Sequence, residues 1–532
     1  MSDTAASIPA TLRATAARYP EQEAIVDGAV RLTYRELDRA VLDACRALIG
    51  MGVHEGDRVA VWAQNCWQWC VVELAVLAAR AVAVPINTRF RGKEAAELLD
   101  NSRAVALFTT SGFLDVDYAA MLRQAAPSHA DLPIVVMSGE VSEKDITWEQ
   151  FLEHGTTVPE EDALKRVADL RADEISDIMY TSGTTGVPKG VIQTHGKNLL
   201  AMKALGAALG FRPGDRNLVL APLFAQFGMR AGLYMGLMHA AATILESAFD
   251  PDAIIDLVER ERVTVLPGPP TILAAFLTPK ARQRDLSSLR IALTGSTVIP
   301  EELVIGLLEN NIFDNVLTAY GLTEACGPVS VSSLQDSPAT VSQYAGRVLE
   351  HLEFRVVDAE GRTMSAGEQG EFLVRGPTVM SGYLNDPEQS AKAVNPEGWL
   401  HTGDVGLVDP GGYVKVTGRL KDMFIVGGFN VYPAEVENSI REHEGVREVA
   451  LVGIPDERLG EVGAAFIVCE RGYEFDETAL REWCRSALAN FKVPRMFLRT
   501  EELPLNSSLK VDKKVLAERA LEMCRARAGQ AG

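Results

Sequence analysis

Short apolar runs alternate with amphipathic stretches between about residues 33 and 293. Thr33 and Glu36 have the spacing of a capping box, which predicts the start of a helix that ends near Gly50. The pattern predicts strands at 58–62, 81–85, 105–109, 218–220, 243–245, 264–266 and 290–293, with helices at 66–79 and 92–99. Because strands with little polar alternation are buried on both faces, we expect an α/β fold with a large N-terminal domain of layered, mostly parallel sheets covered by helices.

The pattern changes twice in the last third of the chain. Short strands between turns, at 353–357, 370–375, 405–408 and 413–417, predict a β-rich subdomain at about 344–417. After Arg419, a helix from Pro433, strands at 446–454 and 464–469 and a helix near 480–488 predict an α+β C-terminal domain. We therefore expect domains at 1–419 and 420–532, with a loose end only at 526–532.

Composition narrows the class of protein. A chain of 532 residues is too long for one hydrophobic core, and 47% hydrophobic with 23% charged residues is typical of a globular protein without membrane spans. The net charge of −20 disfavours nucleic acid as a partner. The N-terminus lacks the features of a signal peptide, and the seven cysteines are scattered, so we expect reduced thiols and a cytoplasmic location. Cys66 and Cys70 are interpreted as core residues.

A loop of glycine and hydroxyl residues follows the apolar run that ends at Tyr180. From Thr181 to Gly190 it contains three glycines, four hydroxyl residues and Lys189. Glycines let backbone N–H groups approach an anion, and a nearby lysine suits a polyphosphate. The loop is not a Walker A motif, because Gly190 rather than Ser or Thr follows the lysine. A plain turn would not need this set of residues.

Four more segments combine residues suited to nucleotide chemistry, each with a simpler alternative. Tyr320 to Glu324 could stack on a base and bind a cation, or end a strand. Asp404 could accept hydrogen bonds from a ribose, or stabilise a turn. Gly418 to Asp422, followed by Gly427 and Gly428, could be a hinge or a solvated linker. Lys510 could be catalytic or a surface charge.

Together, in this order, these segments resemble the adenylate-forming (AMP-binding) superfamily of acyl-CoA synthetases, luciferases and peptide-synthetase adenylation domains. The resemblance covers about residues 12–516. It implies an ATP-dependent, AMP-forming acid–CoA ligase in which a carboxylate is first adenylated and then transferred to coenzyme A. The implied co-substrates are ATP, coenzyme A and a hydrophobic carboxylic acid, with Mg²⁺ as the metal.

The resemblance also implies roles for individual residues. The β- and γ-phosphates would be bound by Thr181, Ser182, Gly183, Thr184, Thr185, Gly186 and Lys189. The rest of the nucleotide site would comprise Gly295, Ser296, Ala319, Tyr320 at the adenine, Gly321, Thr323 at the α-phosphate, and Asp404 and Arg419 at the ribose. Glu324 would hold Mg²⁺, and Lys510 would act with Thr323, Glu324 and Lys189 in catalysis. Lys421 would be the hinge, with Gly427, Gly428 and Phe429 near the pantetheine of CoA.

The acyl pocket is where this chain departs from the implied pattern. Its candidates are Phe224, Ala225, Gln226, Phe227, Gly228, Met229, Gly268, Gly295, Ser296 and Thr297. Many acyl-CoA synthetases carry histidine or an aromatic residue where Ala225 stands, so a roomier pocket is expected; fatty, aryl, alicyclic and steroid-derived acids all fit. Arg230 is interpreted as a surface or inter-helix arginine, with a polar group of the substrate as the alternative partner. Leu509 stands where glycine commonly precedes the lysine.

Two other functions remain open at this stage. One is a ligase that passes its adenylate to an amine or to a carrier protein, which would have to act in trans because the chain ends soon after Lys510. The other is a non-enzymatic binding protein, which the joint presence of Lys189, Glu324 and Lys510 disfavours. The sequence leaves a homodimer open as the oligomeric state.

The hinge assignment predicts separate effects on the two half-reactions. Lys421→Pro should slow thioester formation about tenfold while sparing adenylation, because proline fixes φ and resists the hinge change. Pyrophosphate exchange and CoA-thioester formation measure the two steps separately, and an equal loss of both would contradict the assignment.

Overall fold

The structure, a computed structural model, describes residues 7–181, 188–295, 299–427, 429–456, 458–506 and 510–530. The chain forms two compact units. The first contains Met1–Phe354 and Val374–His401, and the second contains Arg355–Leu373 and Thr402–Gly532. The predicted domain boundary between residues 419 and 420 stays a prediction.

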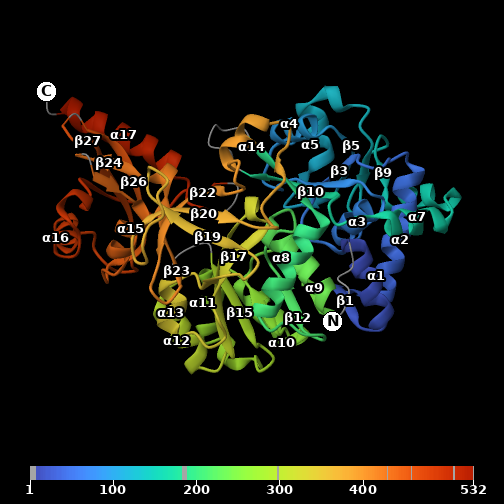
Figure 1. Cartoon of the computed structure of the whole chain (residues 1–532), viewed down its shortest axis with the longest axis horizontal. Coiled ribbons are helices and arrows are strands. Elements are labelled where there is room, and N and C mark those ends of the chain that lie inside the picture. The colour runs from blue at the N-terminus through green and yellow to red at the C-terminus, as the bar shows by residue number, and fades with distance from the viewer. Residues whose placement is uncertain are drawn as a thin grey trace. The chain divides into compact units, whose positions relative to one another are not determined.

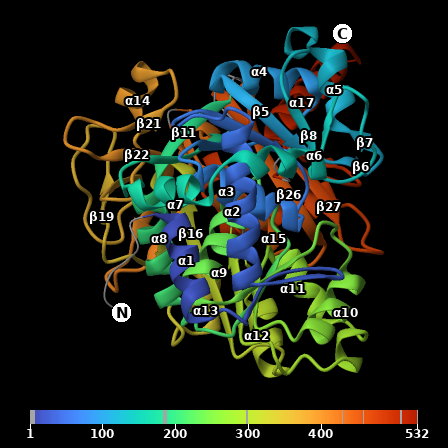
Figure 2. The ribbon, with the colours of Figure 1, turned by 90° about the vertical axis from the view of Figure 1, so that its right-hand side faces the viewer.

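Two large sheets form the frame of the first unit (Figures 1 and 2). The nine-stranded sheet has the order β18 (Arg347–Val348), β17 (Gly327–Val331), β16 (Asn315–Leu322), β15 (Ile291–Gly295), β14 (Val265–Pro267), β12 (Arg216–Val219), β13 (Ala242–Leu245), β1 (Glu23–Asp27) and β2 (Val30–Thr33). The eight-stranded sheet has the order β21 (Gly382–Tyr383), β11 (Lys189–Thr194), β10 (Ile175–Thr181), β4 (Val82–Pro85), β3 (Arg58–Trp62), β5 (Ala104–Thr109), β8 (Ile134–Val136) and β9 (Ile146–Thr147). A separate two-stranded sheet joins β6 (Ser111–Phe113) to β7 (Val116–Asp117).

The side chains of each strand alternate between two cores, because successive residues of a strand point to opposite faces. Val59 and Val61 of β3 lie in the central core, whereas Trp62 lies in an outer core. Ile291 of β15 lies in the same central core, and Ala292 lies in a different outer core. The central core therefore fills the space between the two sheets, and each sheet is apolar on both faces.

Helices cover these faces in layers. Buried residues of the central core come from α1 (Ile8–Arg18), α2 (Tyr34–Gly50), α3 (Trp67–Ala78), α6 (Trp148–Glu153), α7 (Glu160–Asp169), α8 (His195–Ala208), the π-helix Phe227–Tyr234 and α9 (Met235–His239). The outer face of the eight-stranded sheet is covered by α4 (Gly92–Ser102) and α5 (Tyr118–Ala125), and that of the nine-stranded sheet by α10 (Pro251–Glu261), α11 (Pro270–Ala274), α12 (Glu301–Glu309) and α13 (Pro338–Gln343). Figures 1 and 2 both show α4 and α5 on the opposite side of this unit from α10 and α12.

The second unit is built around a smaller sheet with helices on both faces. Its strands are β25 (Phe429–Val431), β24 (Phe424–Val426), β27 (Gly460–Cys469) and β26 (Val446–Asp456), with β28 (Met496–Arg499) beside β27. One face packs against α15 (Pro433–Arg441) and α16 (Glu477–Ala487), and the other packs against α17 (Lys513–Gln530). A four-stranded sheet has the order β19 (Glu353–Val357), β20 (Gly370–Arg375), β22 (Leu400–Val408) and β23 (Val414–Arg419).

The predicted α/β fold class is confirmed, and many predicted elements agree with the structure. The capping box at Thr33 and Glu36 opens α2, and β3, β19 and β20 have the predicted bounds. The predicted loose end at 526–532 is wrong in part, since α17 continues to Gln530. Among the described residues, no helix combines the length and the apolar character that crossing a membrane requires.

A carboxyl group lies within the central core. Glu73 of α3 is fully buried, and the hydroxyl of Tyr234 donates a hydrogen bond to its Oε1 at 2.6 Å. Its Oε2 has no hydrogen-bond partner. Burial raises the pKa of Glu73 from 4.5 to about 8, although the bond from Tyr234 opposes the shift. The folded chain therefore keeps a proton that the unfolded chain releases at much lower pH.

This shift predicts a pH-dependent effect of Glu73→Gln. Because the folded pKa is raised, the contribution of Glu73 to stability is complete below pH 4.5 and is lost as the pH rises through about 8. Glutamine can accept the same bond from Tyr234 without ionising. The stability difference in favour of the variant should grow by roughly 1.4 kcal/mol per pH unit between the two pKa values. Thermal unfolding of both proteins at several pH values tests this, and a Tm difference independent of pH would contradict it.

Candidate active site

The candidate site residues of the first unit follow the carboxyl ends of parallel strands. Strands β12, β14, β15 and β16 run parallel to one another. Parallel strands end at the same edge of a sheet, which is where ligands bind in open α/β folds. The segments at these ends contain predicted residues for both the acyl group and the nucleotide: 224–229 after β12, Gly268 after β14, Gly295 at the end of β15, and 319–324 at the end of β16.

Two glycines allow the backbone to approach closely at this edge. Gly295 pairs in register with Ala319, and a Cβ atom on Gly295 would lie 2.8 Å from the carbonyl oxygen of Ala319. A Cβ atom on Gly321 would lie 2.1 Å from the carbonyl oxygen of Gly327. Neither position has room for a side chain without movement of the backbone. Tyr320, between them in the sequence, is half-buried.

The turn after β16 carries Thr323 and Glu324. Its backbone is held from two sides, because the Gln193 side-chain amide donates to the Thr323 carbonyl at 2.9 Å and the Met380 N–H donates to the Glu324 carbonyl at 2.7 Å. The Tyr383 hydroxyl donates to Glu324 Oε1 at 3.0 Å. These contacts fix the turn and orient the carboxylate.

The surroundings of Glu324 fit Mg²⁺ only if the substrate supplies most of its ligands. Tyr383 engages one carboxylate oxygen, which leaves Glu324 Oε2 for a cation. Within the described part of the chain, no group of three or more His, Cys, Asp or Glu residues could hold a metal ion. Mg²⁺ commonly binds through one or two carboxylates together with substrate phosphates, so one glutamate next to a phosphate site is compatible with it.

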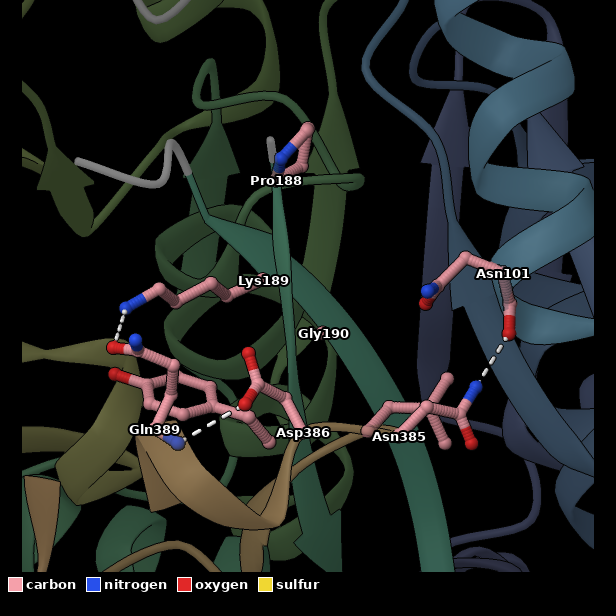
Figure 3. Close-up of a pocket in the computed structure, with 9 residues that line it drawn as sticks. Asn101, Pro188, Lys189, Gly190, Asn385, Asp386 and Gln389 are labelled. Atoms are coloured by element: carbon pink, nitrogen blue, oxygen red, sulfur yellow. Dashed lines mark hydrogen bonds between the residues drawn. The ribbon is translucent and has the colours of Figure 1, made fainter. Parts of the chain in front are cut away.

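Lys189 begins β11, directly opposite Thr181 of β10. Its Nζ donates to Gln389 Oε1 at 2.9 Å and lies 5.0 Å from the centre of the Tyr383 ring. Figure 3 shows the Lys189 side chain pointing toward Gln389. The two residues line a cavity of about 160 Å³, with Asn101, Pro188, Gly190, Tyr383, Leu384, Asn385 and Asp386.

The predicted acyl residues lie on a turn and on a π-helix. The turn is closed by the Ala225 N–H, which donates to the Pro222 carbonyl at 2.9 Å. Phe227, Gly228 and Met229 are the first three residues of the π-helix. Gly228 must be small, since a Cβ atom there would lie 2.2 Å from the Pro222 carbonyl oxygen. Phe227 and Gly228 border a cavity of about 10 Å³, which is too small to admit an acid unless side chains move.

The second unit brings together four predicted residues of its own. Asp404 and Arg419 are paired across β22 and β23, and Arg419 Nε lies 2.9 Å from Asp404 Oδ1. Lys510 lies at a loop closed by reciprocal bonds with Asn506. Although the residue is exposed, desolvation and the charge of Arg419 lower the pKa of Lys510; Asp404 opposes this shift and Lys421 adds to it. Four charged groups from distant positions are therefore electrostatically coupled.

The predicted CoA segment also lies in the second unit. Gly427 has a φ of 57°, which favours glycine. Phe429 is 58% exposed and stacks on Phe491 with the ring centroids 4.8 Å apart. Lys421 lies in a short 3₁₀ turn, Leu420–Asp422, between β23 and β24.

Comparisons with known proteins agree with this arrangement. The family model described as "AMP-binding enzyme" matches residues 12–384, and that of the "AMP-binding enzyme C-terminal domain" matches residues 435–510. The chain belongs to the AMP-binding enzyme family. This confirms the predicted family.

Relatives and solved structures add detail. A 3-[(3aS,4S,7aS)-7a-methyl-1,5-dioxo-octahydro-1H-inden-4-yl]propanoyl:CoA ligase of Rhodococcus jostii is 42% identical over 97% of this chain and 99% of its own length. A ligase of the same name from Mycobacterium tuberculosis is also 42% identical, over 96% of this chain and 98% of its own. The structure of the anthranilate CoA ligase AuaEII with anthranoyl-AMP matches with a TM-score of 0.85 at 26% identity, over 98% of this chain and 99% of its own. The predicted enzyme class, an ATP-dependent acid–CoA ligase, is confirmed.

Not all predicted site residues of this family member can be placed. Ser182, Gly183, Thr184, Thr185, Gly186, Ser296, Thr297, Gly428 and Leu509 lie outside the described residues. The interpretation of Arg230 as a surface arginine is wrong, because its side chain is only 1% exposed; its inter-helix alternative agrees with its contact to Asn198 of α8. Cys66 and Cys70 are buried, as expected for core residues.

Three residues that were not predicted hold the predicted ones in place. Gln193, Tyr383 and Gln389 contact Thr323, Glu324 and Lys189 respectively. Gln193 could have been noticed, since it is a polar residue that follows the apolar pair Val191 and Ile192 of β11. Tyr383 and Gln389 carry no local signal, because only the tertiary structure brings them to the site.

Proposed function

We propose that this family member ligates CoA to a propanoic acid carried on a fused-ring alicyclic body. The proposal rests on one observation: two relatives that are 42% identical over nearly the whole chain are both named as ligases of the same bicyclic propanoate. This acid falls within the alicyclic and steroid-derived acids expected from the sequence.

The residues around the predicted acyl pocket support a bulky, rigid acid. Ala225 is smaller than the histidine or aromatic residue at this position in many acyl-CoA synthetases, and Phe227 offers exposed apolar surface. A ring system loses little conformational entropy on binding, so a wide apolar pocket suits it better than a flexible chain. The small cavity beside Phe227 has to open for such an acid, and an exposed side chain such as that of Phe227 can move more readily than a buried one.

The first half-reaction would take place at the strand ends of the first unit. A carboxylate oxygen of the acid attacks the α-phosphorus of ATP, the bond to the β-phosphate oxygen breaks, and pyrophosphate leaves. Lys189 and the loop from Thr181 would bind the departing phosphates, while Thr323 would donate to the α-phosphate. Tyr320, with Gly295, Ala319 and Gly321, would border the adenine. These residues act by positioning and by neutralising charge.

Glu324 would hold Mg²⁺ through Oε2, with Tyr383 fixing the carboxylate by its bond to Oε1. A bound Mg²⁺ would supply positive charge to the phosphate oxygens. The Tyr383 hydroxyl is well placed for this role, because partners that orient a metal ligand strengthen binding.

Residues of the second unit would complete both steps. Asp404 and Arg419 would bind the ribose, and Lys510 would stabilise the charge that develops on the carboxylate and α-phosphate. Desolvation and the positive charges of Arg419 and Lys421 lower the pKa of Lys510, and the carboxylate of Asp404 opposes this shift. In the second half-reaction the CoA sulfur attacks the acyl carbon and AMP leaves, with Gly427, Gly428 and Phe429 beside the pantetheine.

The catalytic assignment of Lys510 predicts a loss of chemistry rather than of folding. Lys510→Ala should lower acid-dependent pyrophosphate exchange roughly 100-fold or more, because a cation that stabilises transition-state charge is removed. The Tm should stay close to that of the wild type, since the residue is exposed. Retained exchange would contradict the assignment. Lys514→Ala, also an exposed lysine, is the matched control.

A panel of acids tests the substrate. The bicyclic dioxo propanoate, ferulate, a medium-chain fatty acid and anthranilate are each supplied with ATP and Mg²⁺, with and without CoA, and pyrophosphate and acyl-CoA are measured. The bicyclic acid should give the highest kcat/KM, and Ala225→Phe should lower that value about tenfold by filling the pocket. A higher kcat/KM for another acid would contradict the proposed substrate. Pyrophosphate release that never yields a thioester would instead favour an amine or a carrier protein as acceptor.

A further inference from the structure

An ion pair lies within the central core of the first unit. Arg230 of the π-helix and Asp177 of β10 are joined at 2.8 Å between Nη2 and Oδ1, and their side chains are 1% and 0% exposed. Replacing a buried ion pair by apolar residues of similar volume is often neutral or stabilising. A gain in folding stability is therefore not enough to explain why two charged side chains are buried here.

The guanidinium of Arg230 uses its three nitrogens on three different residues. Besides Asp177, Nη1 contacts the sulfur of Met179 at 3.0 Å and Nε donates to Asn198 Oδ1. Met179 lies on β10, as Asp177 does, and Asn198 lies on α8. Because the guanidinium is planar and all three of its nitrogens make contacts, it fixes the orientation of the π-helix relative to β10 and α8 as well as its distance from them.

Asn198 extends the contact to the turn that carries Glu324. The thiol of Cys326, two residues after Glu324, donates to Asn198 Oδ1 at 3.3 Å. Cys326 has a φ of 61°, so the backbone turns sharply there. Asn198 also donates to Asp177 Oδ2 at 2.8 Å. One buried network thus joins the π-helix, β10, α8 and the turn after β16.

The same elements carry the predicted reactants. The π-helix begins with Phe227, Gly228 and Met229 at the predicted acyl pocket. Strand β10 ends at Thr181, where the predicted phosphate loop begins. The carboxylate and the α-phosphate have to meet within roughly 3–3.5 Å, and a displacement of about 1 Å can cost 100-fold in rate. A rigid link between the two elements would control that distance.

We propose that Arg230 is a positioning residue for adenylation: through Asp177 and Asn198 it holds the acyl-pocket helix in a fixed relation to the phosphate-binding strand and the Glu324 turn. This inference rests on the proposed function. It assigns Arg230 no contact with substrate, which distinguishes it from the substrate-binding alternative considered from the sequence.

The decisive variant removes both charges and puts apolar side chains in their places. In Asp177→Leu/Arg230→Met, Asn198 keeps the Cys326 thiol as a donor and Ser176 Oγ, at 2.9 Å, as an acceptor, so its amide group stays satisfied. The Tm of the double variant should lie within a few degrees of the wild type. The kcat of acid-dependent pyrophosphate exchange should fall about 100-fold, while the KM for ATP should change less than about threefold. Arg230→Lys keeps the positive charge but loses the planar set of guanidinium donors. Its kcat should therefore fall by less than that of the double variant.

The controls separate the possible outcomes. Arg290→Met breaks a different ion pair, which is only partly buried: that of Arg290 with Asp215, at 2.6 Å, at the amino ends of the strands. This variant should have a lower Tm and an unchanged kcat. If the double variant keeps kcat within about threefold of the wild type, the pair is only structural and the proposal fails. If the double variant does not fold, kcat is measured for Arg230→Lys and Asp177→Asn below their Tm. A kcat within about threefold of the wild type in both single variants would then contradict the proposal. Absence of exchange with every acid in the wild type would overturn the proposed function, and this inference with it.

Discussion

The direction of the strands is the constraint on which the site of the first unit depends. Because β12, β14, β15 and β16 are parallel, their carboxyl ends lie at one edge, and segments separated by almost a hundred residues meet there. The small residues at these ends follow from the same constraint. Gly295 and Gly321 lie where neighbouring backbone leaves no room for a Cβ atom, so the edge can present peptide groups and a few chosen side chains.

The interior of the first unit contains ionisable side chains as well as apolar ones. Glu73 with Tyr234, and Asp177 with Arg230, place ionisable groups among apolar side chains of the central core. Each group carries a desolvation cost, which the network offsets only by satisfying nearly every donor and acceptor. The π-helix that supplies Tyr234 and Arg230 also carries predicted acyl-pocket residues, as is frequent for π-helical segments near functional sites.

The sequence predicted what depends on local pattern. Buried parallel strands such as β3 are nearly continuous apolar runs, and a capping box marks α2, so both were found with close bounds. The phosphate loop, Glu324 and Lys510 could be proposed as site residues because each belongs to a compact sequence motif. The burial of Arg230 was missed, since its partners lie far away in the sequence and an arginine is rarely buried. Tyr383 and Gln389, which contact Glu324 and Lys189, were missed because they too lie far from their partners in the sequence.

A crystal structure with a non-hydrolysable acyl-adenylate analogue would test the account most directly, because one molecule carries both the acyl body and the nucleotide. We expect an acyl body against Phe227 to Met229, an adenine beside Tyr320, and an intact contact between Arg230 and Asp177 that touches no part of the ligand. An acyl body that lies elsewhere, or an Arg230 that leaves Asp177 to bind the ligand, would contradict it.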